Sequence, residues 1–243
     1  MTKIIVHTKG LLSSCPVLVG ADAGEAAKIA AGICASGAAI INCRNSEKIS
    51  NKIESETKAI GLESITVQIA DGEKNKTIEN AIGTVKALVD SRLDRDAVVI
   101  AVGGGTVGDI AAFAASIYLR GIRVIHVPTT LLAMADSAIG GKTGVDLGGK
   151  NVIGTFHQPS AVVVDLSALD TLPPEQLRQG VSEILKCGVI GDRNLFGFLE
   201  KNPGKILEKD ADTIKEAVVK AIEVKARLVA VDERESRAVN QGN

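Results

Sequence analysis

The first two-thirds of the chain alternate between short apolar runs and longer segments with helical spacing. Runs typical of buried strands occupy residues 3–8, 16–20, 38–43, 63–70, 96–102, 123–128 and 161–166. Helical spacing of apolar positions occupies residues 24–37, 76–93 and 109–119. This alternation predicts an α/β fold, with a mostly parallel sheet covered by helices on both faces.

The pattern changes after about residue 172. Two prolines open a helical segment at residues 173–190, and further helical segments follow at residues 193–202 and 211–237 with no strand between them. We therefore predict two domains. Residues 1–172 form a Rossmann-like α/β domain, and residues 173–243 belong to an all-helical domain.

One residue interrupts the apolar stripe of the last helical segment. The stripe consists of Ile214, Val218, Ala221, Ile222, Leu228 and Val229. Lys225 falls at its centre, where a buried ammonium is costly unless it is paired or faces an anion. Three interpretations stay open for Lys225: it lines a cleft, its amine reaches solvent while its stem packs, or it pairs with Asp232.

A glycine-rich stretch follows the apolar run at residues 96–102. Gly103, Gly104, Gly105 and Gly108 lie between this predicted strand and the helical segment at residues 109–119, and they contain a G-x-G-x-x-G pattern. The pattern comes about a hundred residues into the chain, and no acid for a ribose hydroxyl follows some twenty residues later. The stretch therefore indicates either a phosphate cradle or only a tight strand-to-helix turn.

Residues 135–151 form a second glycine-rich segment that also carries cations. Asp136, Lys142, Lys150 and Asn151 fall within it, shortly after Thr129–Thr130 at a predicted strand end. A flexible surface loop is one interpretation. The other is that both glycine-rich segments meet at the carboxyl ends of the strands, where backbone amides and lysines bind phosphate.

Two further groups of polar residues allow a simpler interpretation. Glu183 and Lys186 are three residues apart on one helical face, as in a solvated salt bridge. His7, His126 and His157 show no metal-ligand spacing, and His126 is predicted to be a buried strand residue.

Composition excludes several classes of protein. The chain has 243 residues, 45% hydrophobic, no Trp and a net charge of −1, which excludes the basic patch of a nucleic-acid-binding protein. No apolar run reaches the length of a membrane span, and the N-terminus lacks a signal-peptide pattern. Cys15, Cys34, Cys43 and Cys187 are scattered, which indicates reduced thiols in a cytoplasmic protein.

Several long strings of this sequence resemble one enzyme family. They are GGGTVGD, YLRG, PTTLLAMADSAIGGKTGVD, GKNVIGTFHQP, DTLPPEQLRQGVSEILK and KARLVAVDERES. Together they resemble the 3-dehydroquinate synthase family over about residues 71–240. The resemblance implies an N-terminal NAD domain, a helical domain and an active site between them, and it favours the phosphate-cradle interpretation of the glycines.

The resemblance also implies a reaction. The family converts 3-deoxy-D-arabino-heptulosonate 7-phosphate, a phosphorylated sugar acid of the shikimate pathway, into 3-dehydroquinate and phosphate. NAD is recycled within each turnover: an alcohol is oxidised, phosphate is eliminated, and the ketone is reduced before ring closure. A divalent metal, zinc or cobalt, acts as Lewis acid.

Matching motifs carry roles to individual residues. The implied cofactor-binding positions are Asp71, Glu73, Lys76, Gly105, Thr106, Val107, Gly108, Asp109, Thr129, Thr130, Lys142, Lys150, Ala168, Leu169, Asp170 and Thr171. The implied catalytic and substrate-binding cluster is Asp136, Lys142, Lys150, Asn151, Lys186, Lys225, Arg237 and Asn240. Glu183 matches a metal ligand, and Arg120 matches an arginine that reaches the neighbouring subunit's site, which implies a homodimer.

The chain departs from the family pattern at two places. Two histidine metal ligands are expected after the last helical segment, but Asn243 stands where the first is expected and the sequence ends there. We therefore expect a C-terminally truncated chain that is inactive alone. Asn42 and Cys43 also replace an acid that often grips the adenine ribose, so the adenosine half is expected to bind differently.

Three other functions compete with this prediction. Another sugar-phosphate cyclase, of the 2-deoxy-scyllo-inosose synthase type, would share the machinery but act on a substrate without a carboxylate. A related polyol or glycerol-phosphate dehydrogenase would release NADH. A non-enzymatic remnant would bind ligands or a partner without turnover.

Overall fold

A seven-stranded sheet forms the centre of the molecule. The computed structural model describes residues 1–7, 14–33 and 36–232. The strand order is β1-β2-β9-β6-β5-β3-β4, and every neighbouring pair is parallel except β1 and β2. The strands are β1 (Thr2–His7), β2 (Ser14–Val19), β3 (Ala38–Asn42), β4 (Ser64–Gln68), β5 (Val98–Gly103), β6 (Arg123–Pro128) and β9 (Ala161–Val164).

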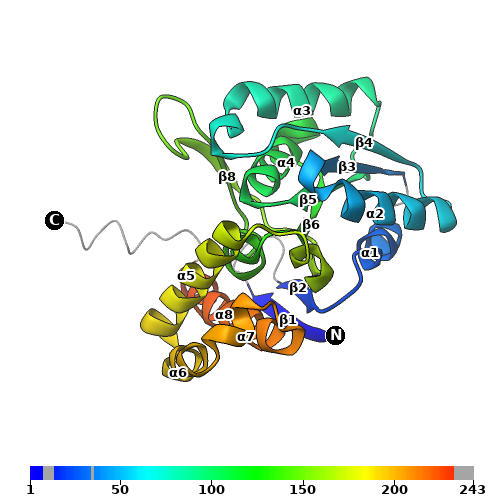
Figure 1. The fold of residues 1–243 in the computed structure, drawn as a ribbon. Helices are drawn as coiled ribbons and strands as arrows, with labels where there is room; N and C mark the ends of the chain where they lie inside the picture. The colour runs from blue at the N-terminus through cyan, green and yellow to red at the C-terminus, as the bar shows by residue number, and fades with distance from the viewer. Residues whose placement is uncertain (8–13, 34–35, 233–243) are drawn as a thin grey trace.

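Helices cover both faces of this sheet (Figure 1). The helices are α1 (Glu25–Ile33), α2 (Glu47–Ala59), α3 (Ile78–Asp90), α4 (Gly105–Ile117), α5 (Pro174–Gly191), α6 (Arg193–Lys201), α7 (Pro203–Leu207) and α8 (Ala211–Val231). Along the central strands Ile40 and Val98 face the core shared with α1, α2, α5 and α8, whereas Ile41 and Val99 face α3 and α4. This alternation gives three layers, and it confirms the predicted α/β class with a mostly parallel sheet.

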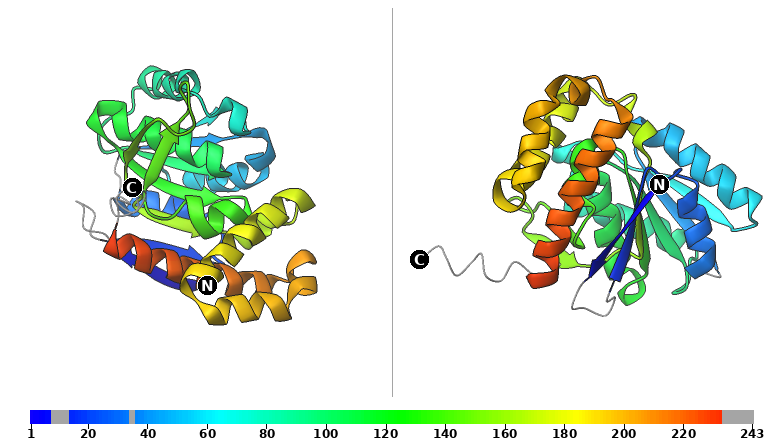
Figure 2. Two further views of the ribbon diagram at one scale, coloured as in Figure 1. Left: turned by 90° about the vertical axis from the view of Figure 1, so that its left-hand side faces the viewer. Right: turned by 90° about the horizontal axis from the view of Figure 1, so that it is seen from below.

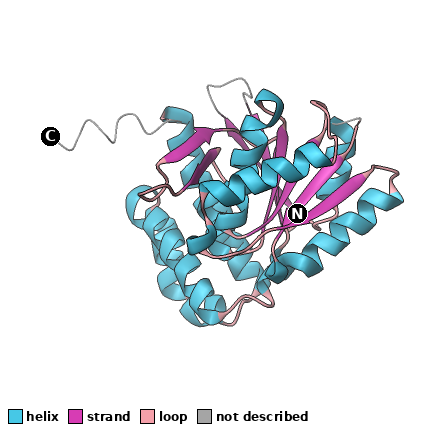
Figure 3. Ribbon diagram, turned by 90° about the horizontal axis from the view of Figure 1, so that it is seen from above, coloured by secondary structure: helices cyan, strands magenta, loops and turns pink. Residues whose placement is uncertain are grey.

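A small hairpin lies apart from the main sheet (Figure 3). It consists of β7 (Lys142–Val145) and β8 (Ile153–Phe156), which pair antiparallel. Val145 packs with Ile110 and Phe113 of α4, so the hairpin is held against the helix that follows the glycine turn. The flexible-loop interpretation of residues 135–151 is therefore wrong for this part of the segment.

The last helices lie below the sheet and enclose its edge. Residues 173–232 hold only helices, as the sequence predicted. α8 packs on β1 and β2, so the first and the last described elements lie side by side (Figure 2). One core joins the sheet to α5 and α8 through residues such as Val17, Ile184 and Ile222. The division at residue 172 stays a prediction.

The apolar stripe of α8 is narrower than predicted. Ile214, Val218 and Ile222 are buried, but Leu228 is 49% exposed. Leu228 lies about 100° around the helix from Val229, which is buried against Gly140. Among the described helices, none is both long and apolar enough to cross a membrane.

Candidate active site

The glycine-rich stretch makes a tight turn from β5 into α4. A Cβ on Gly103 would lie 2.6 Å from the Cβ of Val107, and one on Gly104 would lie 3.1 Å from Cγ2 of Thr130. Gly104 is the N-cap of α4 and supplies no side chain to cap it. The first N–H groups of a helix lack partners within the helix and attract anions. The turn therefore has the form of a phosphate cradle.

Two hollows of similar size meet at this turn. The first, about 610 Å³, lies between the start of α4, the β7–β8 hairpin and α8, and we call it the hairpin hollow. The second, about 590 Å³, lies between the segment after β3 and residues 165–173. These residues link β9 to α5, and we call the second cavity the link hollow. Gly105 lines the first and Gly104 the second, so an extended ligand across the turn would reach both.

Lysines and carboxylates are paired in the hairpin hollow. Nζ of Lys225 lies 2.6 Å from Oδ1 of Asp136, and both side chains are largely buried. Nζ of Lys150 lies 2.8 Å from Oε1 of Glu73 on the exposed side. The cleft-lining interpretation of Lys225 is therefore confirmed, with Asp136 as its ion-pair partner.

The most buried pair ties the hairpin to the glycine turn. Nζ of Lys76 lies 2.5 Å from Oδ2 of Asp109 and donates to Oδ1 of Asn151 at 2.6 Å. The N–H of Asp146 donates to the carbonyl of Lys76 at 2.8 Å, which fixes the hairpin from a second side. Burial raises the pKa of Asp109 to about 6, against the lowering effect of Lys76.

A histidine lies directly behind the turn. A Cβ on Gly108 would lie 3.4 Å from Nδ1 of His126, which is buried on β6 as predicted. Burial lowers the pKa of His126 to about 4, with a smaller contribution from His157. His126 is therefore neutral at physiological pH, and it supports the turn without adding charge to it.

Most of the residues implied by the resemblance line one of the two hollows. The hairpin hollow is lined by Glu73, Lys76, Gly105, Thr106, Asp109, Asp136, Lys142, Lys150, Asn151 and Lys225. The link hollow is lined by Asp71, Thr129, Thr130, Ala168 and Thr171. The two glycine-rich segments thus converge beside the strand ends, as the second interpretation of residues 135–151 predicted.

The other implied residues lie elsewhere. Val107 is fully buried, and Gly108 lies over His126. Leu169 is buried and Asp170 is exposed, and neither lines the link hollow. Arg237 and Asn240 lie outside the described residues.

Glu183 and Lys186 form an ion pair on α5, outside the hairpin hollow. Asp136 nevertheless contributes to raising the pKa of Lys186, after the main effect of Glu183, so this lysine lies near the cluster. In the described part of the chain, no three His, Cys, Asp or Glu side chains gather as a metal site. One carboxylate does not hold a divalent metal, so these residues do not make the metal centre by themselves.

Sequence reasoning missed the neutral lining of both hollows. Thr143, Thr155 and Phe156 of the hairpin line the first, and Ser167 and Gln176 line the second. The signal for the hairpin was the short alternation in KTGV and IGTF, which the surrounding glycines obscured.

Comparison with known proteins identifies the family. A model of the N-terminal part of 3-dehydroquinate synthase matches residues 66–179, and a model of the C-terminal part matches residues 180–241. The 3-dehydroquinate synthase of Rhodopirellula baltica is 41% identical over 208 residues, which are 85% of this chain and 56% of that protein. The chain thus spans little more than half the length of this relative.

Two solved structures share the fold. The 2-epi-5-epi-valiolone synthase of Streptomyces hygroscopicus subsp. jinggangensis 5008, with NAD⁺ and Zn²⁺ bound, superposes with a TM-score of 0.85 at 28% identity, covering 92% of this chain and 63% of that one. A 2-deoxy-scyllo-inosose synthase superposes with a TM-score of 0.84 at 23% identity, covering 97% of this chain and 65% of that one. The N-terminal and C-terminal models of one family match this chain one after the other along residues 66–241, so the chain belongs to the 3-dehydroquinate synthase family.

Proposed function

We propose that this chain carries the dinucleotide-binding and substrate-binding part of a 3-dehydroquinate synthase. The protein would convert 3-deoxy-D-arabino-heptulosonate 7-phosphate into 3-dehydroquinate and phosphate with NAD and a divalent metal. The observation that carries the proposal is the junction of two hollows at an uncapped glycine turn, one of them lined by lysines. In this family, such a junction fits a dinucleotide beside an anionic sugar.

The glycine turn and the link hollow fit NAD. The N–H groups at the start of α4 would receive the pyrophosphate, and Cβ atoms on Gly103 or Gly104 would crowd Val107 or Thr130. Thr129, Thr130 and Ala168 would hold the adenosine half. When bound, NAD supplies a reversible acceptor for the hydride of a substrate hydroxyl.

The lysines of the hairpin hollow would bind the anionic ends of the substrate. Lys142, Lys150 and Lys225 supply positive charge to phosphate and carboxylate oxygens in a partly dry cavity. Asp136 orients the ammonium group of Lys225 at 2.6 Å. Elimination then needs positioning above all, because the substrate's own phosphate can accept the proton.

Binding tests the proposal first. NAD titrated into the purified chain should bind at one site, and the sugar phosphate should bind more tightly in its presence. A chain that binds neither ligand contradicts the proposal. Any turnover with added Zn²⁺ then separates the two enzymatic alternatives: a cyclase releases phosphate without net NADH, whereas a dehydrogenase accumulates NADH.

We also propose a cytoplasmic homodimer in which Arg120 reaches the neighbouring subunit's site. In support, Arg120 is exposed in the short 3-10 turn that follows α4, with a positive φ of 69°, and it lines neither hollow of its own chain. Cys15, Cys43 and Cys187 are free thiols, as is usual in a reducing compartment. Subunit mixing tests the dimer: Arg120→Ala and Lys225→Met chains, each defective alone, should regain sugar-phosphate binding at one site when mixed.

A further inference from the structure

Lys209 makes three hydrogen bonds that the proposed function does not explain. It lies between α7 and α8, and its Nζ donates to the carbonyls of Leu169 at 2.7 Å, Asp170 at 3.1 Å and Leu172 at 2.9 Å. An ammonium group has three protons to donate, so these acceptors use all of them. All three carbonyls belong to the link that forms one wall of the link hollow.

The backbone of Lys209 is itself well fixed. Its φ is +58°, and its N–H donates to the carbonyl of Ile206 at 3.1 Å. The next residue, Asp210, caps α8 by accepting from the N–H of Thr213 at 2.9 Å. The lysine therefore projects from a rigid corner between two helices, and its ammonium group has a defined place.

The other end of the link is held in a different way. Asp165 accepts from the N–H of Ser167 at 3.0 Å and, through Oδ2, from the N–H of Ala23 at 3.0 Å. Asp165 thus fixes the start of the link to the turn between β2 and α1, and Lys209 fixes its end to the corner between α7 and α8. Between them lie Ala168 and Thr171, which line the hollow.

Two features indicate that Lys209 affects the shape of the link more than the stability of the fold. Leu169 and Leu172 are buried at 2% and 6% exposure, so apolar packing keeps the link attached to the core without Lys209. What the ammonium group adds is a common donor for three carbonyls in the last turn of the link, of which, among the described residues, only that of Leu169 also accepts from a backbone N–H, that of Leu172 at 3.0 Å. Its loss should therefore alter the shape of the wall more than the stability of the fold.

We propose that Lys209 is a positioning residue of the dinucleotide site, which shapes the link for the adenosine half of the cofactor from outside the hollow. This inference rests on the proposed function, because it takes a dinucleotide as the occupant of the link hollow. It assigns the helical region a part in cofactor binding as well as in substrate binding.

Half-ligands test the inference. ADP probes the adenosine half, nicotinamide mononucleotide probes the other half, and NAD probes both, each titrated calorimetrically into the full chain. Lys209→Met keeps the length of the stem and removes the three donors. We expect about a tenfold loss of ADP and NAD affinity, no change for the mononucleotide, and partial recovery in Lys209→Arg, which restores donors.

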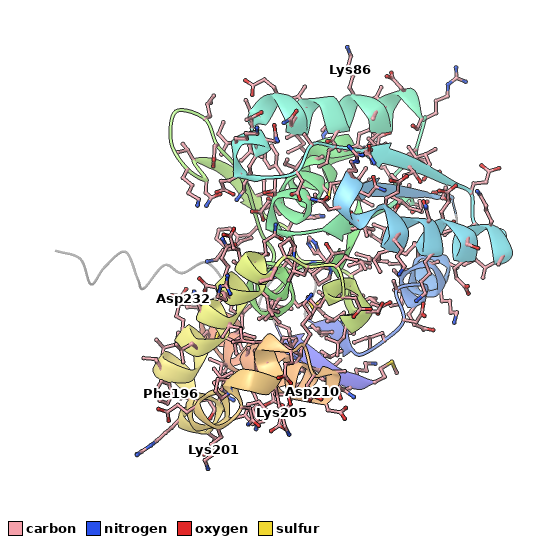
Figure 4. All side chains as sticks on the ribbon, viewed as in Figure 1. Lys86, Phe196, Lys201, Lys205, Asp210 and Asp232 are labelled. Atoms are coloured by element: carbon pink, nitrogen blue, oxygen red, sulfur yellow. The ribbon has the colours of Figure 1, made fainter. Side chains whose placement is uncertain are left out.

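The control is Lys201→Met, an exposed lysine at the end of α6 on the outer surface of the same helical region (Figure 4). It should bind all three ligands like the unmodified chain. Unchanged ADP affinity in Lys209→Met overturns the inference alone. Equal losses for ADP and the mononucleotide, with a lower melting temperature, also overturn it, because they show a general structural role. An unmodified chain that binds neither ADP nor NAD overturns the proposed function as well.

Discussion

The two hollows are alike in size but differ in the groups that form their walls. In the hairpin hollow, Lys76, Lys150 and Lys225 are each paired with a carboxylate. The wall of the link hollow is instead shaped by backbone carbonyls held by Lys209 and by the carboxylate of Asp165. The hairpin hollow therefore contains lysines that are already paired with carboxylates, whereas one wall of the link hollow is a stretch of fixed backbone. Charged side chains line the link hollow on its other side, namely Arg44, Glu47, Lys48 and Asp71.

This difference predicts different responses to ligands. An anion entering the hairpin hollow competes with carboxylates for the lysines, so affinity depends on how readily each ion pair opens. A ligand that contacts the link displaces no ion-pair partner from that wall of the link hollow. Its affinity for this wall therefore depends on how well their shapes match. Variants that affect both hollows, or only one, test this contrast.

The largest effect is expected from Gly103→Ala, because the glycine turn belongs to both hollows. The added Cβ would lie 2.6–2.9 Å from three atoms of Val107, and the carbonyl of Gly103 is fixed by the N–H of Thr129 at 2.9 Å. We expect a loss of about 3 kcal/mol in the free energy of unfolding, measured by urea titration, and loss of binding in both hollows. Gly83→Ala is the control, since nothing lies within 4 Å of its Cβ. Wild-type ADP affinity in Gly103→Ala would contradict the shared role of the turn.

The second effect is a pH dependence that originates behind the turn. Burial lowers the pKa of His126 in the folded chain to about 4, below the ordinary histidine value of 6.5. Between pH 6.5 and 4 the ring of His126 is therefore protonated in the unfolded chain but stays neutral in the folded chain. The free energy of unfolding consequently decreases as the pH falls through this range. The loss in the free energy of unfolding at pH 5, relative to pH 8, is about 2 kcal/mol.

Denaturant titrations at pH 8 and pH 5 measure this contribution as the difference between wild type and His126→Gln. The comparison removes the titration of Asp109, whose raised pKa acts in the opposite direction: its carboxylate costs stability as the pH rises toward 6. His7→Gln, on the exposed side of β1, is the matched control. Equal pH dependence in wild type and His126→Gln would show that the ring is not buried in its neutral form.

A smaller effect, confined to the hairpin hollow, is expected from Lys225→Met. Its loss leaves the carboxylate of Asp136 without its partner, and the side chains are 17% and 24% exposed. A double-mutant cycle with Asp136→Asn should give a coupling of about 1 kcal/mol in stability. Sugar-phosphate affinity should fall while ADP affinity stays unchanged. A parallel loss of ADP affinity would show that the two hollows are not independent.

The smallest effect on stability is expected from Lys150→Met. This lysine and Glu73 are 70% and 52% exposed, so their ion pair is largely screened by solvent. The midpoint of thermal unfolding should not change, whereas sugar-phosphate affinity should fall about fivefold. Lys58→Met, which removes the exposed pair with Glu54 on α2, should change neither quantity.

The sequence predicted the layers better than the cavities between them. Strands such as 38–43 and 96–102 were predictable because residues buried on both faces form uninterrupted apolar runs. α2 was missed because its exposed Lys and Glu residues outweigh the few buried side chains, such as Ile49 and Ile53. The hairpin was missed because its strands are only four residues long and glycine-rich.

The candidate site was predictable to the extent that single residues conflict with their surroundings. The position of Lys225 in an apolar stripe made a cleft one of three interpretations, without any comparison. Its partner Asp136 lies 89 positions away in the sequence, and no local pattern joins the two. Nothing in the sequence pointed to Lys209, because its partners are backbone carbonyls. Every residue carries a backbone carbonyl, so no pattern of side chains marks these three.

The position of β1 also bears on the order in which the chain acquires its structure. Val17 of β2 pairs with Val162, and α8, which covers both strands, begins only at Ala211. β1 and β2 are therefore synthesised well before β9, which pairs with β2, and before α8, which covers both strands. Until β9 and α8 emerge, the edge of β2 and one face of both strands stay uncovered, and an uncovered strand edge favours pairing with other nascent chains.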